Sequence, residues 1–173
     1  ACHLLETDGA KILVDCGLFQ GSREIEDMNF DPFGFDPTAI DAVVITHAHI
    51  DHIGRLPKLV REGFRGVILS TAPTRELARV LLEDALHLAM REQRTLFSSE
   101  DPEHTFTLWE DMPYRAPRAV KDAALMLYDA GHILGSAMVQ VEAGGKRILF
   151  TGDLGNIPSI LLPPPDAVGD IDY

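Results

Sequence analysis

Several features are scarce or absent in this chain of 173 residues, and each absence narrows what the protein can be. No run of eighteen apolar residues occurs, and the chain does not begin with a basic segment followed by an apolar one. The sequence therefore predicts neither a membrane span nor a signal peptide. Its two cysteines, Cys2 and Cys16, lack the C-x-x-C spacing of a thiolate zinc site. A bridge between them across a hairpin at Asp8-Gly9 is geometrically conceivable, but we interpret them as reduced thiols of a cytoplasmic protein.

Basic residues are scarce relative to acidic ones. Fifteen Lys and Arg stand against 27 Asp and Glu, which gives a formal net charge of −12. This is the wrong sign for a surface that binds nucleic acid by neutralising its phosphates. If the substrate is a polyanion, the cations must come from bound metal or from another part of the protein.

Apolar segments of strand type dominate both ends of the chain, and helical patterns lie between them. The length suits a single core, and the mixture predicts a layered α/β domain. Two hairpins are expected, one turning at Asp8-Gly9 and one at Gly144-Gly145. The expected strands are residues 2–5, 11–16, 41–46, 66–71, 124–130, 137–143 and 146–152, and the expected helices are residues 53–63 and 73–94.

The remaining segments are predicted to be connections. Residues 19–41 form a long loop in which Asp36 and Pro37 begin a short helical turn, and residues 98–118 form a polar, Pro-bearing connection. Residues 157–173 are predicted to be a Pro-rich loop. On the helix at 73–94, the pattern places His87 on a solvated face, and an apolar stripe is expected on the other: Leu77, Leu81, Ala85 and Leu88.

Three of the seven histidines lie within six residues, in the stretch THAHIDHIGRLP at 46–57. His47 and His49 alternate at the end of a predicted strand, so their rings can share one face. Asp51 and His52 follow where the chain turns into the next helix. Imidazole and carboxylate are the ligands that zinc and manganese prefer, so this spacing predicts a metal site.

Two later turns supply further candidate ligands. His132 lies between Gly131 and Gly135 after one predicted strand, and Asp153 follows Gly152 after another. Six ligands are too many for one tetrahedral ion and suit two ions that share a carboxylate. The division that we expect is His47, His49 and His132 on the first ion, Asp51 and His52 on the second, and Asp153 as the bridge. The second ion is then one ligand short.

Taken together, these motifs resemble the metallo-β-lactamase fold hydrolases. HAHIDH at 47–52 matches their H-x-H-x-D-H motif, Gly-His at 131–132 their third motif and Gly-Asp at 152–153 their fourth. Asp15, in LVDCG, matches the first motif, an acid that supports the metal loop and does not bind metal. The resemblance implies an α/β fold of the αββα sandwich type, with mixed sheets and flanking helices.

Within that superfamily, the chain resembles the β-CASP subgroup of RNA-processing nucleases in CHLLET, LVDCGLFQG, THAHIDHIGRLPKLVREGF, GHILGS and TGDLGN. Members of the subgroup also have a further acidic motif, an inserted β-CASP domain and a closing segment with the last metal-binding histidine, none of which this sequence contains. The resemblance implies that residues 1–173 are the N-terminal portion of a metallo-β-lactamase domain and that the fold is present only in part.

The resemblance also implies a function: metal-dependent hydrolysis of RNA phosphodiesters, in processing or decay, by a hydroxide that two divalent ions activate. Zinc is the first candidate and manganese the second. Asp51 would orient the hydroxide and Asp153 would bridge the ions, while the acid for the leaving group would come from the β-CASP domain. The expected partners are RNA and that domain but no membrane. A homodimer is left open, and the expected location is the cytoplasm.

Two other classes of function stay open. A small-molecule metallohydrolase of the glyoxalase or thioesterase type would use the same ligands, although the eighty residues between His52 and His132 fit it less well. A non-catalytic metal-binding fragment or subunit is the second alternative, although such relatives usually lose ligands. The sequence leaves open RNA against DNA and endonuclease against exonuclease.

Overall fold

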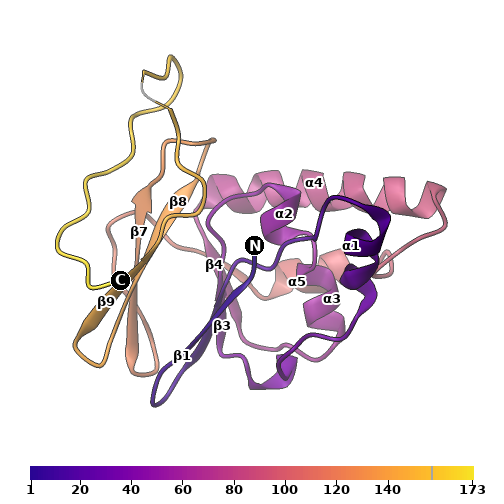
Figure 1. The fold of residues 1–173 in the computed structure, drawn as a ribbon, viewed down its shortest axis with the longest axis horizontal. Helices are drawn as coiled ribbons and strands as arrows, with labels where there is room; N and C mark the ends of the chain where they lie inside the picture. Colours follow the sequence, from indigo (N-terminus) through magenta and orange to yellow (C-terminus); the bar gives the residue numbers. More distant parts are fainter. Residues whose placement is uncertain (157) are drawn as a thin grey trace.

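A computed structural model describes residues 1–156 and 158–173 and shows a layered α/β fold (Figure 1). The strands are β1 (His3–Glu6), β2 (Lys11–Val14), β3 (Ala42–Val44), β4 (Val67–Ser70), β5 (Trp109–Asp111), β6 (Arg118–Val120), β7 (Ala123–Asp129), β8 (Ala137–Ala143) and β9 (Lys146–Phe150). The helices are α1 (Arg23–Asp27), α2 (Ile50–Ile53), α3 (Leu56–Arg61), α4 (Ala72–Arg91) and α5 (Asp101–Thr107), with 3₁₀ turns η1 (Met28–Phe30) and η2 (Pro37–Ala39).

The strands form two sheets. The first has the order β1-β2-β3-β4-β5, in which β1 is antiparallel to β2 and the remaining pairs are parallel. The second has the order β6-β7-β8-β9 and is antiparallel throughout. Gly144 and Gly145 both have positive φ in the turn between β8 and β9, as a tight two-residue hairpin requires.

Two apolar clusters hold the layers together. One lies between the sheets, where Val14 and Val44 of the first sheet meet Leu125 and Val139 of the second. The other lies on the opposite face of the first sheet, where residues such as Val43 pack against α2, α3 and α4. Alternate side chains of β2 and β3 thus serve two cores, which explains why these short strands are apolar at every position from Ile12 to Val14.

The helices cover only the first sheet among the residues that the structure describes, and the C-terminal segment runs beside β9 on the far side of the second sheet (Figure 1). In that segment the backbone N–H of Leu149 donates to the carbonyl of Tyr173 at 3.0 Å. Three layers of an αββα sandwich are therefore present, which confirms the expected fold class in its partial form. No helix in the described part is both long and apolar enough to cross a bilayer.

Several local predictions are confirmed. All seven predicted strands form, both hairpins turn where expected, and Asp36 caps η2 by accepting from the N–H of Thr38 at 2.9 Å. The two cysteines are free thiols. Of the predicted Pro-rich end, Ile157 lies outside the described residues, and residues 158–173 contain no helix or strand.

Other local predictions are wrong. Residues 98–118 are not a plain connection, because α5 and β5 lie within them, and β6 begins at Arg118. The helix expected at 53–63 forms only over Leu56–Arg61, as α3, and an additional short helix, α2, precedes it at Ile50–Ile53. The buried stripe of α4 consists of Thr74, Ala78, Leu82 and Leu86, whereas Leu88 of the predicted stripe is 50% exposed.

Candidate metal centre

The predicted ligands come from loops that leave the two sheets at the same edge. The parallel strands β2 and β3 both end there, so Asp15 and the segment 45–49 emerge side by side. Strands β7 and β9 are each antiparallel to β8 and therefore parallel to each other, which brings the following turns with His132 and Asp153 to one edge. The N–H of Ala137 donates to the carbonyl of Thr46 at 2.7 Å and joins the two sheets at this point.

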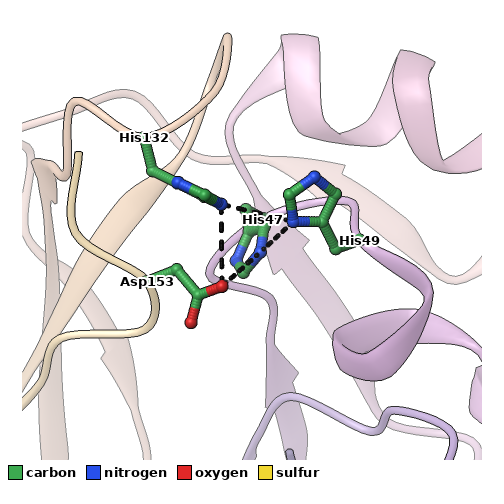
Figure 2. Close-up of side chains that lie close together, drawn as sticks. All are labelled: His47, His49, His132 and Asp153. Atoms are coloured by element: carbon green, nitrogen blue, oxygen red, sulfur yellow. Dashed lines mark hydrogen bonds and ion pairs between the residues drawn. The ribbon is translucent and has the colours of Figure 1, made fainter. Parts of the chain in front are cut away.

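Four of the predicted ligands converge, as Figure 2 shows: His47, His49, His132 and Asp153. Their ligand atoms all lie within 4.8 Å of one another. The Nδ1 of His49 lies 2.9 Å from Nε2 of His47 and 3.3 Å from Nε2 of His132. The Oδ2 of Asp153 lies 3.6 Å from Nε2 of His47 and 3.6 Å from Nε2 of His132.

These spacings fit a divalent ion. Zinc bonds of about 2.0–2.2 Å in tetrahedral geometry place ligand atoms roughly 3.3–3.6 Å apart. Three of the four separations given above fall in that range, and the pair of His47 and His49 is closer at 2.9 Å. Three imidazole nitrogens with one carboxylate oxygen are also a donor set that zinc accepts. The first predicted group of ligands therefore matches a metal site in both chemistry and geometry.

The remaining two predicted ligands form a second group on the other side of Asp153. Nε2 of His52 lies 3.6 Å from Oδ2 of Asp51 and 3.7 Å from Oδ1 of Asp153. The two oxygens of Asp153 thus face different groups, Oδ2 toward the three histidines and Oδ1 toward His52. The second group contains three candidate ligand atoms, one fewer than a four-coordinate ion requires.

Asp15 orients His52 from behind and lies outside both ligand groups. Its buried carboxylate accepts from Nδ1 of His52 at 2.7 Å and from the N–H and hydroxyl of Thr46, each at 2.8 Å. With Nδ1 occupied, Nε2 is the nitrogen of His52 that is left to face the site. Asp15 adopts a φ of 62°, a conformation that Asp and Asn tolerate better than most residues.

Burial and charge move the pKa values of two site histidines in opposite directions. Burial lowers the pKa of His47 to about 3, and the neighbouring histidines add to the effect. Burial alone would also lower the pKa of His52, but the hydrogen bond and charge of Asp15, with a smaller effect of Asp51, raise it above its usual range. His47 is therefore held neutral, as a metal ligand must be, whereas His52 shares a proton with Asp15.

Two glycines allow the site loops to approach each other. A Cβ on Gly155 would lie 1.7 Å from the carbonyl oxygen of Gly131, and one on Gly17 would lie 1.6 Å from that of Asp51. The N–H of Gly155 donates to the carbonyl of Ala130 at 2.9 Å, which fixes the Asp153 turn against the His132 turn. Both glycines are thus required by packing against backbone.

Sequence-based prediction missed one contributor to the site and placed one histidine outside it correctly. Thr46 was not singled out, yet its hydroxyl lies 3.0 Å from Nδ1 of His47 and also contacts Asp15. Its position directly before the first histidine was the available signal. His87 is exposed on α4 and lies outside the cluster, as its pattern predicts.

A layered fold with histidines and carboxylates gathered at one sheet edge defines a metal-binding α/β protein. The chain belongs to the metallo-β-lactamase superfamily, which it matches over residues 1–172. Superfamily membership and the His/Asp group together imply a divalent metal. The resemblance inferred from the motifs is thereby confirmed at the level of the superfamily.

Named relatives share most of this chain but are much longer. Ribonuclease TTHA0252 of Thermus thermophilus is 42% identical over 165 residues, which are 95% of this chain and 37% of that protein. Endoribonuclease YSH1 of Kluyveromyces lactis is 32% identical over 162 residues, 88% of this chain and 21% of that protein. The chain thus spans well under half the length of these relatives.

Solved structures support the same fold. A metallo-β-lactamase with a HARLDQ motif from Cronobacter sakazakii has a TM-score of 0.62 at 18% sequence identity. The match covers 92% of this chain and 55% of that one. At this level of identity the likeness concerns the fold alone.

Proposed function

We propose that the protein carrying this chain hydrolyses RNA phosphodiesters with the help of two divalent metal ions. The observation that carries the proposal is the placement of Asp153, whose two oxygens face two separate groups of ligands. A carboxylate between two such groups is typical of sites that hold a pair of ions about 3.5–4 Å apart. The similarity to two named ribonucleases favours RNA as the substrate.

The residues of the chain have distinct roles in this proposal. His47, His49 and His132 would hold the first ion, Asp51 and His52 would hold the second, and Asp153 would contribute a ligand oxygen to each. The ions, when bound, supply a water of lowered pKa and offset the charge of the phosphate. Asp51 is 44% exposed and faces the open side of the second group, so it is placed to orient the attacking water and accept a hydrogen bond from it.

Zinc is the metal that we favour, with manganese as the alternative, because the first group is rich in imidazole. Bound cations would also offset the repulsion between RNA and a chain that carries a formal charge of −12. We further propose that residues 1–173 are the N-terminal portion of a metallo-β-lactamase domain in a longer β-CASP-type nuclease. The fraction of each relative that the chain covers supports that division. The cytoplasmic location and a homodimer stay predictions from the sequence.

The test compares Asp153→Ala with the parent in the full-length protein, and Asp84→Ala, an exposed acid on α4, is the matched control. Metal content is measured by elemental analysis, and activity by cleavage of a labelled single-stranded RNA. We expect Asp153→Ala to lose metal together with more than about 100-fold of the cleavage rate, because even outer partners of metal ligands are worth 10–100-fold.

Two outcomes would overturn the proposal. Cleavage of RNA by Asp153→Ala at the parental rate would show that the site is elsewhere. A parent that hydrolyses an activated thioester and leaves RNA intact would instead place the protein with the small-molecule hydrolases of the superfamily. Asp84→Ala should match the parent in metal content and rate.

A further inference from the structure

A cavity of about 410 Å³ opens beside the second group of ligands. Its lining includes the acids Asp15, Asp51 and Asp153 and the ring-bearing residues His52, His3 of β1 and Phe150 of β9. His3 lies in the stretch CHLLET and Phe150 directly precedes TGDLGN, but neither was predicted to contribute to the site. The volume lies in the range of pockets that hold small ligands, about 300–1,000 Å³.

The rings of His3 and Phe150 form a pair across the two sheets. Their centroids lie 5.8 Å apart, with an angle of 40° between the ring planes. Phe150 is half-buried and packs against the core between the sheets, which fixes its position. His3 is exposed, and its ring makes no hydrogen bond to any of the residues 1–156 and 158–173. The pair is thus an anchored aromatic surface with one ring available for contact.

The charges around the cavity decide where each part of a nucleotide can lie. Asp51 and Asp153 make the lining next to the ligand groups acidic, so a phosphate can lie there only next to bound cations. His3 and Phe150 add ring surfaces to the same lining. A phosphate held next to the ligand groups would therefore leave the attached base to lie against the rings.

We propose that His3 and Phe150 form a stacking subsite for the base of the nucleotide next to the phosphate that is cleaved. This inference rests on the proposed ribonuclease function. Stacking on aromatic and histidine rings is a common way to hold bases of single-stranded RNA, and it is tolerant of base identity because every base has a π-face. The subsite would hold the strand in position without selecting a sequence.

The test uses the full-length protein with three variants: His3→Ala, which removes the ring, His3→Phe, which keeps a ring, and His87→Ala, which removes an exposed histidine on α4. Each protein is tested on a single-stranded RNA with a mapped cut site. It is also tested on two versions of this RNA, one with an abasic nucleotide directly before the cut site and one with an abasic nucleotide directly after it. Base stacking on a ring is worth roughly 5- to 150-fold in affinity.

We expect His3→Ala to raise KM by that factor with little change in kcat, and His3→Phe and His87→Ala to stay near the parent. An abasic nucleotide at one of the two positions should raise KM for the parent and leave KM of His3→Ala unchanged, because the contact is already lost. The inference is overturned if His3→Ala cleaves these RNAs like the parent, if abasic RNA weakens both proteins equally, or if His3→Phe behaves like His3→Ala.

These outcomes are separable from failure of the proposed function. A parent with no RNA cleavage overturns the proposed function and, with it, this subsite. A parent that cleaves RNA while His3→Ala is unaffected overturns the subsite alone. Because the side chain of His3 is exposed, its removal leaves the fold intact, and thermal unfolding of each variant verifies this.

Discussion

Replacing Asp15 by Asn should invert the tautomer of His52, a proposed metal ligand, without moving the backbone. The carboxylate accepts on one oxygen from the N–H of Thr46 at 2.8 Å and on the other from Nδ1 of His52 at 2.7 Å. An amide offers only one acceptor. The N–H of Thr46 belongs to the backbone and always donates, so the amide oxygen will turn to it and the NH₂ group will face His52.

Facing an NH₂ group, Nδ1 of His52 must act as an acceptor, and the proton of the neutral ring then lies on Nε2, the atom that faces the second group of ligands. Loss of such an orienting partner typically lowers metal affinity by about 10–100-fold. Loss of a charge-assisted hydrogen bond should also lower the free energy of unfolding of the metal-free protein by about 1.5–3 kcal/mol. Asn tolerates the φ of 62° at position 15, so the loop itself is preserved.

The assay is a competitive titration of zinc against a chelator in metal-free full-length protein, with urea unfolding measured in parallel. Asp36→Asn is the matched control, since Asp36 caps η2 by accepting from Thr38 on an exposed turn outside the ligand groups. We expect Asp15→Asn to bind the second ion at least tenfold more weakly and Asp36→Asn to bind both ions like the parent. Equal affinity of Asp15→Asn and the parent for both ions would refute the role of Asp15.

Two further predictions concern the approach of the loops and the protons of the site. Gly155→Ala should separate the turns that carry His132 and Asp153, destabilise the fold by about 1–3 kcal/mol and weaken zinc binding, because its Cβ would lie 1.7 Å from a backbone oxygen. Gly34→Ala is the control, because no atom lies within 4 Å of the added Cβ, and its free energy of unfolding should stay within about 0.5 kcal/mol of the parental value. Parental zinc affinity in Gly155→Ala would contradict the argument. Because the pKa of His52 is raised, its hydrogen bond to Asp15 stabilises the metal-free protein fully below the pKa of the unfolded chain, and this contribution is lost as the pH rises through the folded pKa. Zinc must displace a proton from His52 but none from His47, so its affinity should rise with pH until His52 is neutral, with proton release measured calorimetrically in several buffers; affinity that is flat from pH 5.5 to 8 would contradict this.

The sheet strands were predictable because their signals are local. Runs such as Lys11–Val14 are apolar, and Asp8-Gly9 and Gly144-Gly145 mark their turns, so no knowledge of distant partners was needed. The strand β5 was not predictable in this way. Trp109–Asp111 is short and polar at two of three positions, and it forms because β4 provides a parallel partner.

The stripe of α4 shows a different limit. Leucine spacing favoured the face of Leu77 and Leu81, but the buried face includes Thr74, whose hydroxyl donates to the carbonyl of Gly135 at 2.9 Å. A hydroxyl satisfied by a residue 61 positions away cannot be recognised from helical periodicity. Tertiary contacts thus selected a face that hydrophobicity alone did not.

The convergence of His47, His49, His132 and Asp153 was predictable because each residue lies in a loop that follows a strand. What the sequence could not supply was the direction of each ring. The structure shows that His49 faces the cluster through Nδ1 while His47 does so through Nε2, and that Asp15 fixes the tautomer of His52. These choices depend on distances between loops that are far apart in the sequence.

The central claim is that this chain holds two ions joined by Asp153. It is tested most directly by anomalous diffraction, at the absorption edge of the bound metal, from crystals of the full-length protein. The account predicts two peaks about 3.5–4 Å apart. One should lie among His47, His49 and His132, and the other beside Asp51 and His52, with an oxygen of Asp153 at each. A single peak, or two peaks that Asp153 does not join, would contradict it.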